Sequence, residues 1–247
     1  MKGKFLPIYL LLATLWLLGY GQLSAQYYHR LEADFTIKEN INDSTSSLVI
    51  GKAFYDTYNQ KLVYDLSFPA KEVWVFQDSL LYKESADTSS MRWSDPSAVI
   101  WSIYHLSLTN QLANFGLSDS LFEISNVEKE EDMVITTYSP LTPFDKFMGP
   151  IMLAKKGKLL DGIVFVDPQG RLVSKQFYRK YNTMGGLPFP GKMIQITYPE
   201  GTARYRITEF ENVQFNQADH ENWYNYPMPD PLDWSRENGP IAGAKPK

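Results

Sequence analysis

Histidines are scarce in this chain, and none has a partner at the spacing of a metal site. The three histidines are His29, His105 and His220. Metal ligands recur two residues apart on a strand or one helical turn apart on a helix, and none of the three meets this requirement. We interpret His105 as a structural residue beside an apolar stripe and His220 as a solvated loop residue. The sequence therefore predicts no metal site and no cofactor.

Acidic and nucleophilic residues form no catalytic pattern either. The run VEKEED gathers carboxylates over 128–132, but a run of like charges at a turn is typical of a solvated surface. Asp167 lies in a DPQG turn that lacks the acidic spacing of a calcium loop. The chain has no Gly-x-Ser-x-Gly motif, no Gly-x-x-x-x-Gly-Lys-Ser/Thr loop and no cysteine. We predict that the protein is not an enzyme; a lipase or glycosidase with a polar cluster built from distant residues is an alternative.

Large apolar side chains are the more informative residues. Aromatic residues form 15% of the chain, a share that suits both β-sheets and apolar binding sites. Residues 59–83 read NQKLVYDLSFPAKEVWVFQDSLLYK and contain three strand-like runs. In the first run a period of two places four apolar side chains on one face, although a slip of one residue would reverse the two faces. These four residues are Leu62, Tyr64, Leu66 and Phe68.

The elements around these residues are mostly strands. Alternating patterns and turn signals predict about ten strands, and connections too short for crossover helices make the sheet antiparallel. We therefore expect one mainly β domain, without internal repeats. The predicted strands cover residues 31–39, 47–56, 62–68, 71–77, 79–83, 132–140, 159–166, 171–181, 191–199 and 203–215.

One segment has the period of a helix. Apolar residues spaced by three and four predict an amphipathic helix over 97–115, with Gly116 as its C-cap. Its apolar stripe consists of Ile100, Tyr104, Leu108 and Leu112, flanked by Trp101 and Phe115.

The insertion at 142–154 has more apolar bulk than an exposed loop normally carries. It is either a short element packed into the core or a mobile lid over an apolar cavity, in which methionine would supply an adaptable surface. The residues that would form such a lid are Phe144, Phe147, Met148 and Ile151.

The N-terminus predicts export. Residues 1–25 combine Lys2 and Lys4 with an apolar run over 5–18 and a small residue at Ala25, which is the layout of a secretory signal peptide. We expect cleavage between Ala25 and Gln26, with an uncleaved membrane anchor as the alternative. Loss of the two lysines changes the net charge from −4 to −6. This balance argues against nucleic acid or an anionic membrane surface as the main partner.

We divide the remaining chain into a domain at 26–218 and a tail at 219–247. The tail is rich in Pro, Asn, Asp and Gly but contains Trp223, Tyr224 and Trp234. We expect its first half to pack on the domain and its end, from about Arg236, to be loose.

The succession of segments resembles the periplasmic outer-membrane lipoprotein carrier family, the LolA-like proteins. The resemblance covers most of 31–216: EADFTIKE, a strand meander with Asn59 and Pro69, an aromatic helix, YSPLTPFDKF, KGKLLDGIVFVDPQGRLVSKQF and a closing FENVQF. Members of this family commonly have an arginine just before the Asn of the strand that matches residues 60–68. Here Tyr58 stands at the nearest position, so the arginine that helps to hold the lid in the family is missing.

The resemblance implies an incompletely closed antiparallel β-barrel with a covering helix and a lid. It further implies a non-enzymatic, monomeric periplasmic carrier, which takes acyl chains of lipoproteins or other lipids from an inner-membrane donor complex to an outer-membrane acceptor. The alternative is a structural or adaptor protein of a cell-envelope assembly, with the aromatic tail as its docking element. The candidate cavity residues are Leu62, Tyr64, Leu66, Phe68, Trp74, Phe76, Trp101 and Tyr104, with Phe144, Phe147, Met148 and Ile151 as the lid.

Overall fold

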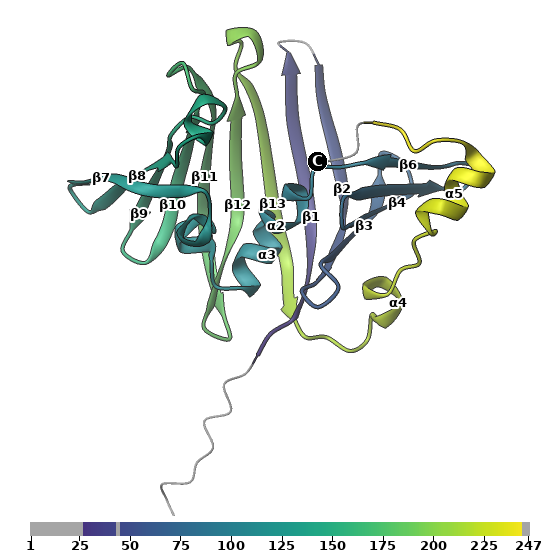
Figure 1. The fold of residues 1–247 in the computed structure, drawn as a ribbon. Helices are drawn as coiled ribbons and strands as arrows, with labels where there is room; N and C mark the ends of the chain where they lie inside the picture. Colours follow the sequence, from purple (N-terminus) through teal and green to yellow (C-terminus); the bar gives the residue numbers. More distant parts are fainter. Residues whose placement is uncertain (1–26, 43–44, 244–247) are drawn as a thin grey trace, which may run out of the picture.

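Thirteen strands form one antiparallel sheet in the computed structural model, which describes residues 27–42 and 45–243 (Figure 1). The strand order is β6-β5-β4-β3-β2-β1-β13-β12-β11-β10-β9-β8-β7. The predicted signal peptide lies outside the described residues. The strands are β1 (Arg30–Asn42), β2 (Thr45–Asp56), β3 (Lys61–Phe68), β4 (Glu72–Gln77), β5 (Leu80–Ser85), β6 (Ser89–Trp93), β7 (Phe122–Glu130), β8 (Met133–Pro140), β9 (Ile151–Lys156), β10 (Leu159–Val166), β11 (Leu172–Met184), β12 (Leu187–Thr197) and β13 (Arg204–Phe215).

The sheet is strongly curved but does not close, because β6 and β7 lie at its two ends (Figure 1). This confirms the predicted open antiparallel barrel. The predicted count of about ten strands is too low, since β6, β7 and β9 were not expected. Most of β7 is polar and exposed, so it lacks the apolar alternation that marks a half-buried strand. Ile151, predicted as part of the lid, instead begins β9 and is buried.

The predicted single helix over 97–115 is wrong. The segment contains two short helices, α2 (Ser97–Ile100) and α3 (Ile103–Leu108), followed by the 3-10 turns η1 (Leu112–Asn114) and η2 (Leu117–Asp119). Ser102 interrupts the helix because its backbone is extended and its side chain accepts a hydrogen bond from the His105 N–H, which makes it the N-cap of α3. Gly116 has the left-handed φ of a C-cap, but it lies eight positions beyond the end of α3.

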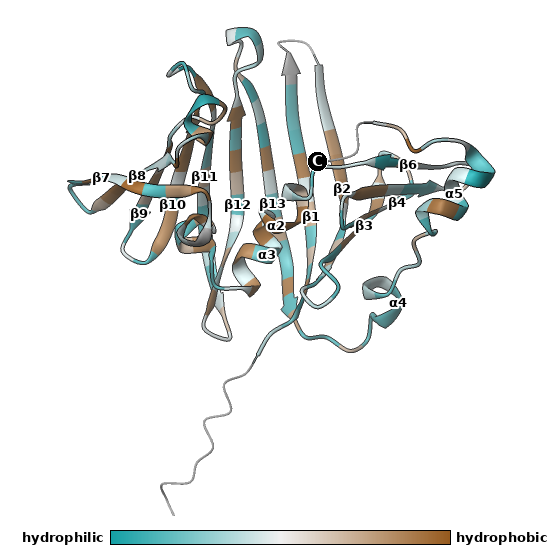
Figure 2. Ribbon diagram, in the orientation of Figure 1, coloured by the Kyte–Doolittle hydropathy of each residue, from teal (hydrophilic) through white to brown (hydrophobic). Residues whose placement is uncertain are grey.

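Apolar side chains pack on both faces of the sheet. We call the face that carries α2 and α3 the inner face and the opposite one the outer face. Polar and apolar residues alternate along the central strands (Figure 2). Such alternation is typical of a sheet whose two faces lie in different environments. On β3, for example, Leu62 and Leu66 belong to the inner cluster and Val63 to the outer one. The alternation read from the sequence thus points Leu62, Tyr64 and Leu66 inward.

The C-terminal segment covers part of the outer face. It contains α4 (Glu221–Tyr224) and α5 (Pro231–Asn238), joined by an extended stretch. Tyr224 is 1% exposed, and the Trp223 ring stacks between the rings of Phe54 and Tyr226. Ordered contacts continue past Arg236, contrary to the expected loose end, because Ala242 forms a parallel bridge with Arg92. No helix among the described residues is long and apolar enough to span a membrane.

The 3-10 turns η3 (Phe144–Lys146) and η4 (Pro199–Gly201) connect strands that are neighbours in the sheet. The Asp167–Gly170 turn between β10 and β11 forms as the sequence predicts, with the Gly170 N–H donating to the Asp167 carbonyl. The inner face is covered mainly by the segment that includes α2, α3 and η1, which we call the covering segment. A site on this face must lie beneath it.

Candidate functional site

A pocket of about 290 Å³ lies on the inner face between the α2–α3 segment and the sheet. This volume is at the lower limit of the roughly 300–1,000 Å³ typical of small-molecule pockets. Its lining is mostly apolar, with several aromatic rings, and also includes the polar side chains of Ser102, Gln176, Gln195, Arg206 and Thr208. The apolar lining comprises Phe35, Ile37, Tyr64, Ala98, Trp101, Ile103, Tyr104, Leu106, Phe115, Phe165, Met193 and Phe210.

Strand alternation and register bring these distant residues together. Phe35 on β1 and Phe210 on β13 are direct partners in the ladder, and both point to the inner face. The ring of Tyr64, from β3, meets Phe35 edge to face at 5.3 Å between centroids. Tyr104, from α3, contacts both Tyr64 and Phe210 at 6.1 and 5.9 Å. These edge-on pairs form a rigid aromatic corner at the base of the pocket.

The two phenols in this corner remain neutral. Burial raises the pKa of Tyr64 to about 12, although the hydrogen bond from Tyr104 and the charge of Arg206 oppose the shift. Burial also raises the pKa of Tyr104 well above its ordinary value, and its hydroxyl serves as the donor to Tyr64. Both hydroxyls therefore stay protonated at neutral pH and can donate hydrogen bonds.

A row of polar side chains crosses the other end of the pocket. Gln176 on β11, Gln195 on β12, Arg206 on β13 and Glu39 on β1 are successive partners across the four strands. Nη2 of Arg206 is 3.2 Å from both carboxylate oxygens of Glu39. The hydroxyl of Tyr178 donates to Oε1 of Gln176 at 2.7 Å. The pocket is therefore amphipathic, with an aromatic base and a polar rim.

The structure separates the predicted cavity residues into three groups. Tyr64, Trp101 and Tyr104 line the pocket. Leu62 and Leu66 are buried in the inner cluster beside it. The three remaining residues do not line it: Trp74 and Phe76 pack against the inner cluster from β4, and Phe68, at the end of β3, is 46% exposed.

The predicted lid residues differ in exposure. Phe147 is 79% exposed and Phe144 is 37% exposed, both around the η3 turn. Met148 packs against the inner cluster, and Ile151 is buried in β9. None of the four lines the 290 Å³ pocket. A gating role for this loop therefore remains a proposal.

Sequence reasoning missed the pocket residues on the central strands. Phe35, Phe210, Met193, Gln195 and Arg206 all come from strands that the sequence predicts. The alternation in ARYRITEF would have placed Arg206 and Phe210 on one face. What the sequence does not reveal is that β1 pairs with β13, and this pairing alone brings Phe35 to Phe210.

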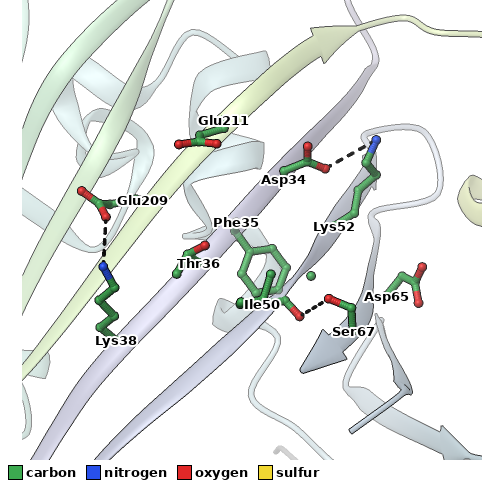
Figure 3. Close-up of a pocket in the computed structure, with 11 residues that line it drawn as sticks. Asp34, Phe35, Thr36, Lys38, Ile50, Lys52, Asp65, Ser67, Glu209 and Glu211 are labelled. Carbon is green, nitrogen blue, oxygen red and sulfur yellow. Dashed lines mark hydrogen bonds and ion pairs between the residues drawn. The ribbon is translucent and has the colours of Figure 1, made fainter. Parts of the chain in front are cut away.

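A second hollow, of about 550 Å³, lies on the outer face and has a different character. Figure 3 shows it lined by Asp34, Lys38, Lys52, Asp65, Glu209 and Glu211, with Phe35 and Ile50 among them. Lys52 pairs with Asp34 at 3.5 Å and Lys38 with Glu209 at 3.7 Å. A lining of four carboxylates and two lysines does not favour an apolar ligand, because such a ligand would displace the water that solvates these charges. Within 27–42 and 45–243, no three His, Asp or Glu side chains gather as a metal site would require.

Comparison with known proteins identifies the fold. No family model matches the chain, and no curated protein matches it by sequence. Among solved structures, a LolA superfamily protein from Nitrosomonas europaea superposes with a TM-score of 0.55 at 10% identity, over 79% of this chain and 90% of that one. A DUF1329 family protein from Desulfovibrio piger superposes with a TM-score of 0.58 at 12% identity, over 82% and 92%. The chain therefore has a LolA-like fold, as its succession of segments predicted.

Proposed function

We propose that this protein is a non-enzymatic periplasmic carrier that binds the acyl chain of a lipoprotein or another lipid on its inner face. The observation that carries the proposal is the aromatic pocket between the open sheet and the α2–α3 segment. An apolar pocket with a polar rim suits an amphiphilic ligand. Its two phenols are neutral, so neither would serve as the base in a hydrolysis reaction. The likeness in fold to a LolA superfamily protein agrees with this function.

Burial of an acyl chain supplies enough free energy for a carrier. Each CH₂ moved from water into an apolar pocket gains about 0.8 kcal/mol, so a C16 chain offers on the order of 10 kcal/mol before ordering costs are subtracted. The pocket of about 290 Å³ is too small for a whole C16 chain. We therefore expect the covering segment to move aside when cargo enters.

The covering segment is suited to such movement. Its helices have four and six residues, far fewer than an isolated helix needs for stability in water, so packing against the sheet holds them in place. Trp101, at the break between them, is 37% exposed although it lines the pocket. The loop that carries Phe144 and Phe147 would act with this segment as the gate.

The carrier would operate between two membranes. The signal-like N-terminus predicts export, and transfer from an inner-membrane donor to an outer-membrane acceptor needs only increasing affinity along the route. The adaptor alternative relied on the aromatic tail as a docking element. Trp223 and Tyr224 are instead packed on the sheet of this same chain, which weakens that alternative.

Photocrosslinking in intact cells tests the proposal. A photoreactive residue is placed at Tyr64 in the pocket, at Phe147 on the loop, or at Tyr205, whose side chain alternates to the outer face of β13 and is 47% exposed. A carrier yields lipid or lipoprotein adducts from Tyr64 and Phe147 but not from Tyr205. Adducts to one protein partner from the tail, with no lipid at Tyr64, would support the adaptor instead.

A further inference from the structure

We propose that the cargo has an anionic head group, a carboxylate or a phosphate, and that Arg206 binds it at the rim of the inner pocket. This inference rests on the proposed function, because it assumes that the aromatic base of the pocket holds the acyl chain. It goes further by naming the chemical class of the cargo.

The polar row provides a set of donors suited to an anion. Neighbouring strands lie about 4.8 Å apart, so Arg206 and Gln195, which are direct partners, can contact one group together. A guanidinium offers five N–H donors in a planar fork that fits carboxylates and phosphates. The side-chain amide of Gln195 has no hydrogen-bond partner within the described part of the chain. Gln176 uses its oxygen to accept from Tyr178, which leaves its NH₂ group available.

The order of residues down the pocket matches the order of groups in an amphiphile. Below the Gln176–Gln195–Arg206 row, the next row of partners contains Tyr178, Met193 and Thr208. The aromatic corner follows. The charge of Arg206 acts on this corner, since it lowers the pKa of Tyr64 against the larger effect of burial. A head group at Arg206 would therefore direct its chain towards Tyr64 and Tyr104.

Glu39 is a competitor for the same cation. Both of its oxygens lie 3.2 Å from Nη2 of Arg206, and Arg206 is the one cationic side chain among the pocket-lining residues of the described chain. Arg206 is 47% exposed, so an incoming anion can reach it from solvent. An acyl chain joined through a neutral ester or amide, as on a lipoprotein, would gain nothing from displacing Glu39. An anionic lipid would gain an ion pair with Arg206 when it displaces Glu39.

Three ligands with the same chain test the inference: hexadecanoic acid, hexadecyl phosphate and the neutral hexadecan-1-ol. Their affinities for the full chain are measured by displacement of an apolar fluorescent probe. We expect Arg206→Gln to weaken binding of one or both anions by about tenfold or more, the loss for a charge-assisted contact, and to leave the alcohol unchanged. Glu39→Gln should strengthen binding of the anions. The control is Arg236→Gln, which removes an exposed arginine paired with Asp233 far from the pocket. It should leave the affinities for all three ligands unchanged.

The outcomes separate the inference from the function on which it rests. An effect confined to the carboxylate identifies a free fatty acid, and one confined to the phosphate identifies a phospholipid type of head group. Equal losses for the acid and the alcohol in Arg206→Gln would overturn the inference, because the arginine would then have only a structural role. If no ligand of the three binds the wild-type protein, the carrier function itself fails.

Discussion

His105 joins the covering segment to the sheet through a hydrogen bond with Tyr55. Nδ1 of His105 and the hydroxyl of Tyr55 are 2.6 Å apart. Burial lowers the pKa of His105 and raises the pKa of Tyr55. At neutral pH the tyrosine therefore donates to a neutral imidazole. The interpretation of His105 as a structural residue agrees with this geometry.

This arrangement predicts a loss of stability on mild acidification. Because the pKa of His105 is lower in the folded state, the unfolded chain binds the extra proton first as the pH falls below about 6.5. The free energy of unfolding should then decrease, by no more than about 1.4 kcal/mol per pH unit, until the folded-state pKa is reached. Urea unfolding between pH 7.5 and 5 measures this. The decrease should be smaller in His105→Gln, and equal slopes in both proteins would contradict the prediction.

Two serines at helix α3, the N-cap Ser102 and the internal Ser107, have hydroxyls with opposite effects on stability. Ser102 caps the helix by accepting from the His105 N–H at 3.2 Å. Ser107 is 1% exposed, and its Oγ has no hydrogen-bond partner among the described residues. A cap stabilises a helix, whereas a buried unpaired hydroxyl carries a desolvation cost.

The same substitution at the two positions should therefore give different results. We expect Ser102→Ala to lower the free energy of unfolding by about 0.5–2 kcal/mol. Ser107→Ala should leave it unchanged or raise it by up to about 1 kcal/mol, because the group removed is unsatisfied. Chemical denaturation measures both. A larger loss for Ser107→Ala than for Ser102→Ala would show that Oγ of Ser107 has a partner in solution.

Elements with a clear apolar period were predictable, and the others were not. The alternation from Leu62 to Leu66 predicted β3 and its shared face, and Pro69 marked its end. The solvated strand β7 gives no such signal, because its pairing with β8 does not depend on buried side chains. The helical period over 97–115 was present, but it cannot show that Ser102 caps a new helix there. Ile100, expected in the buried stripe, is consequently 38% exposed.

At the scale of the molecule, the candidate site depends on contacts that no local pattern encodes. The pocket combines residues from β1, β3, β10 to β13 and the covering segment. The resemblance predicted the general arrangement of sheet and covering helix. It did not predict the central strands as the walls of the pocket, and three of the eight residues proposed for the cavity line it.

Amide hydrogen exchange, followed along the whole chain with and without hexadecanoic acid, tests whether the covering segment moves. We expect ligand to accelerate exchange at Ile103–Leu108, since a C16 chain does not fit the pocket unless α3 is displaced. Exchange in β5, which pairs with β4 and β6 and carries Leu80 and Tyr82 of the outer cluster, serves as the internal control and should not change. Stronger protection of α3 in the loaded protein would show that the chain enters without displacing it.

The pairing of β1 with β13 sets the order in which this sheet can be assembled. Every other pair of neighbouring strands is also adjacent in sequence, so each half of the sheet can form from local segments. The central ladder must wait for Arg204–Phe215, because Leu31 has Phe215 as its partner. One edge of β1 therefore stays unpaired until most of the chain has been synthesised. Unpaired strand edges can form hydrogen bonds with other polypeptides and cause aggregation. We therefore expect correct folding to depend on keeping this edge from pairing with other chains until β13 has been synthesised.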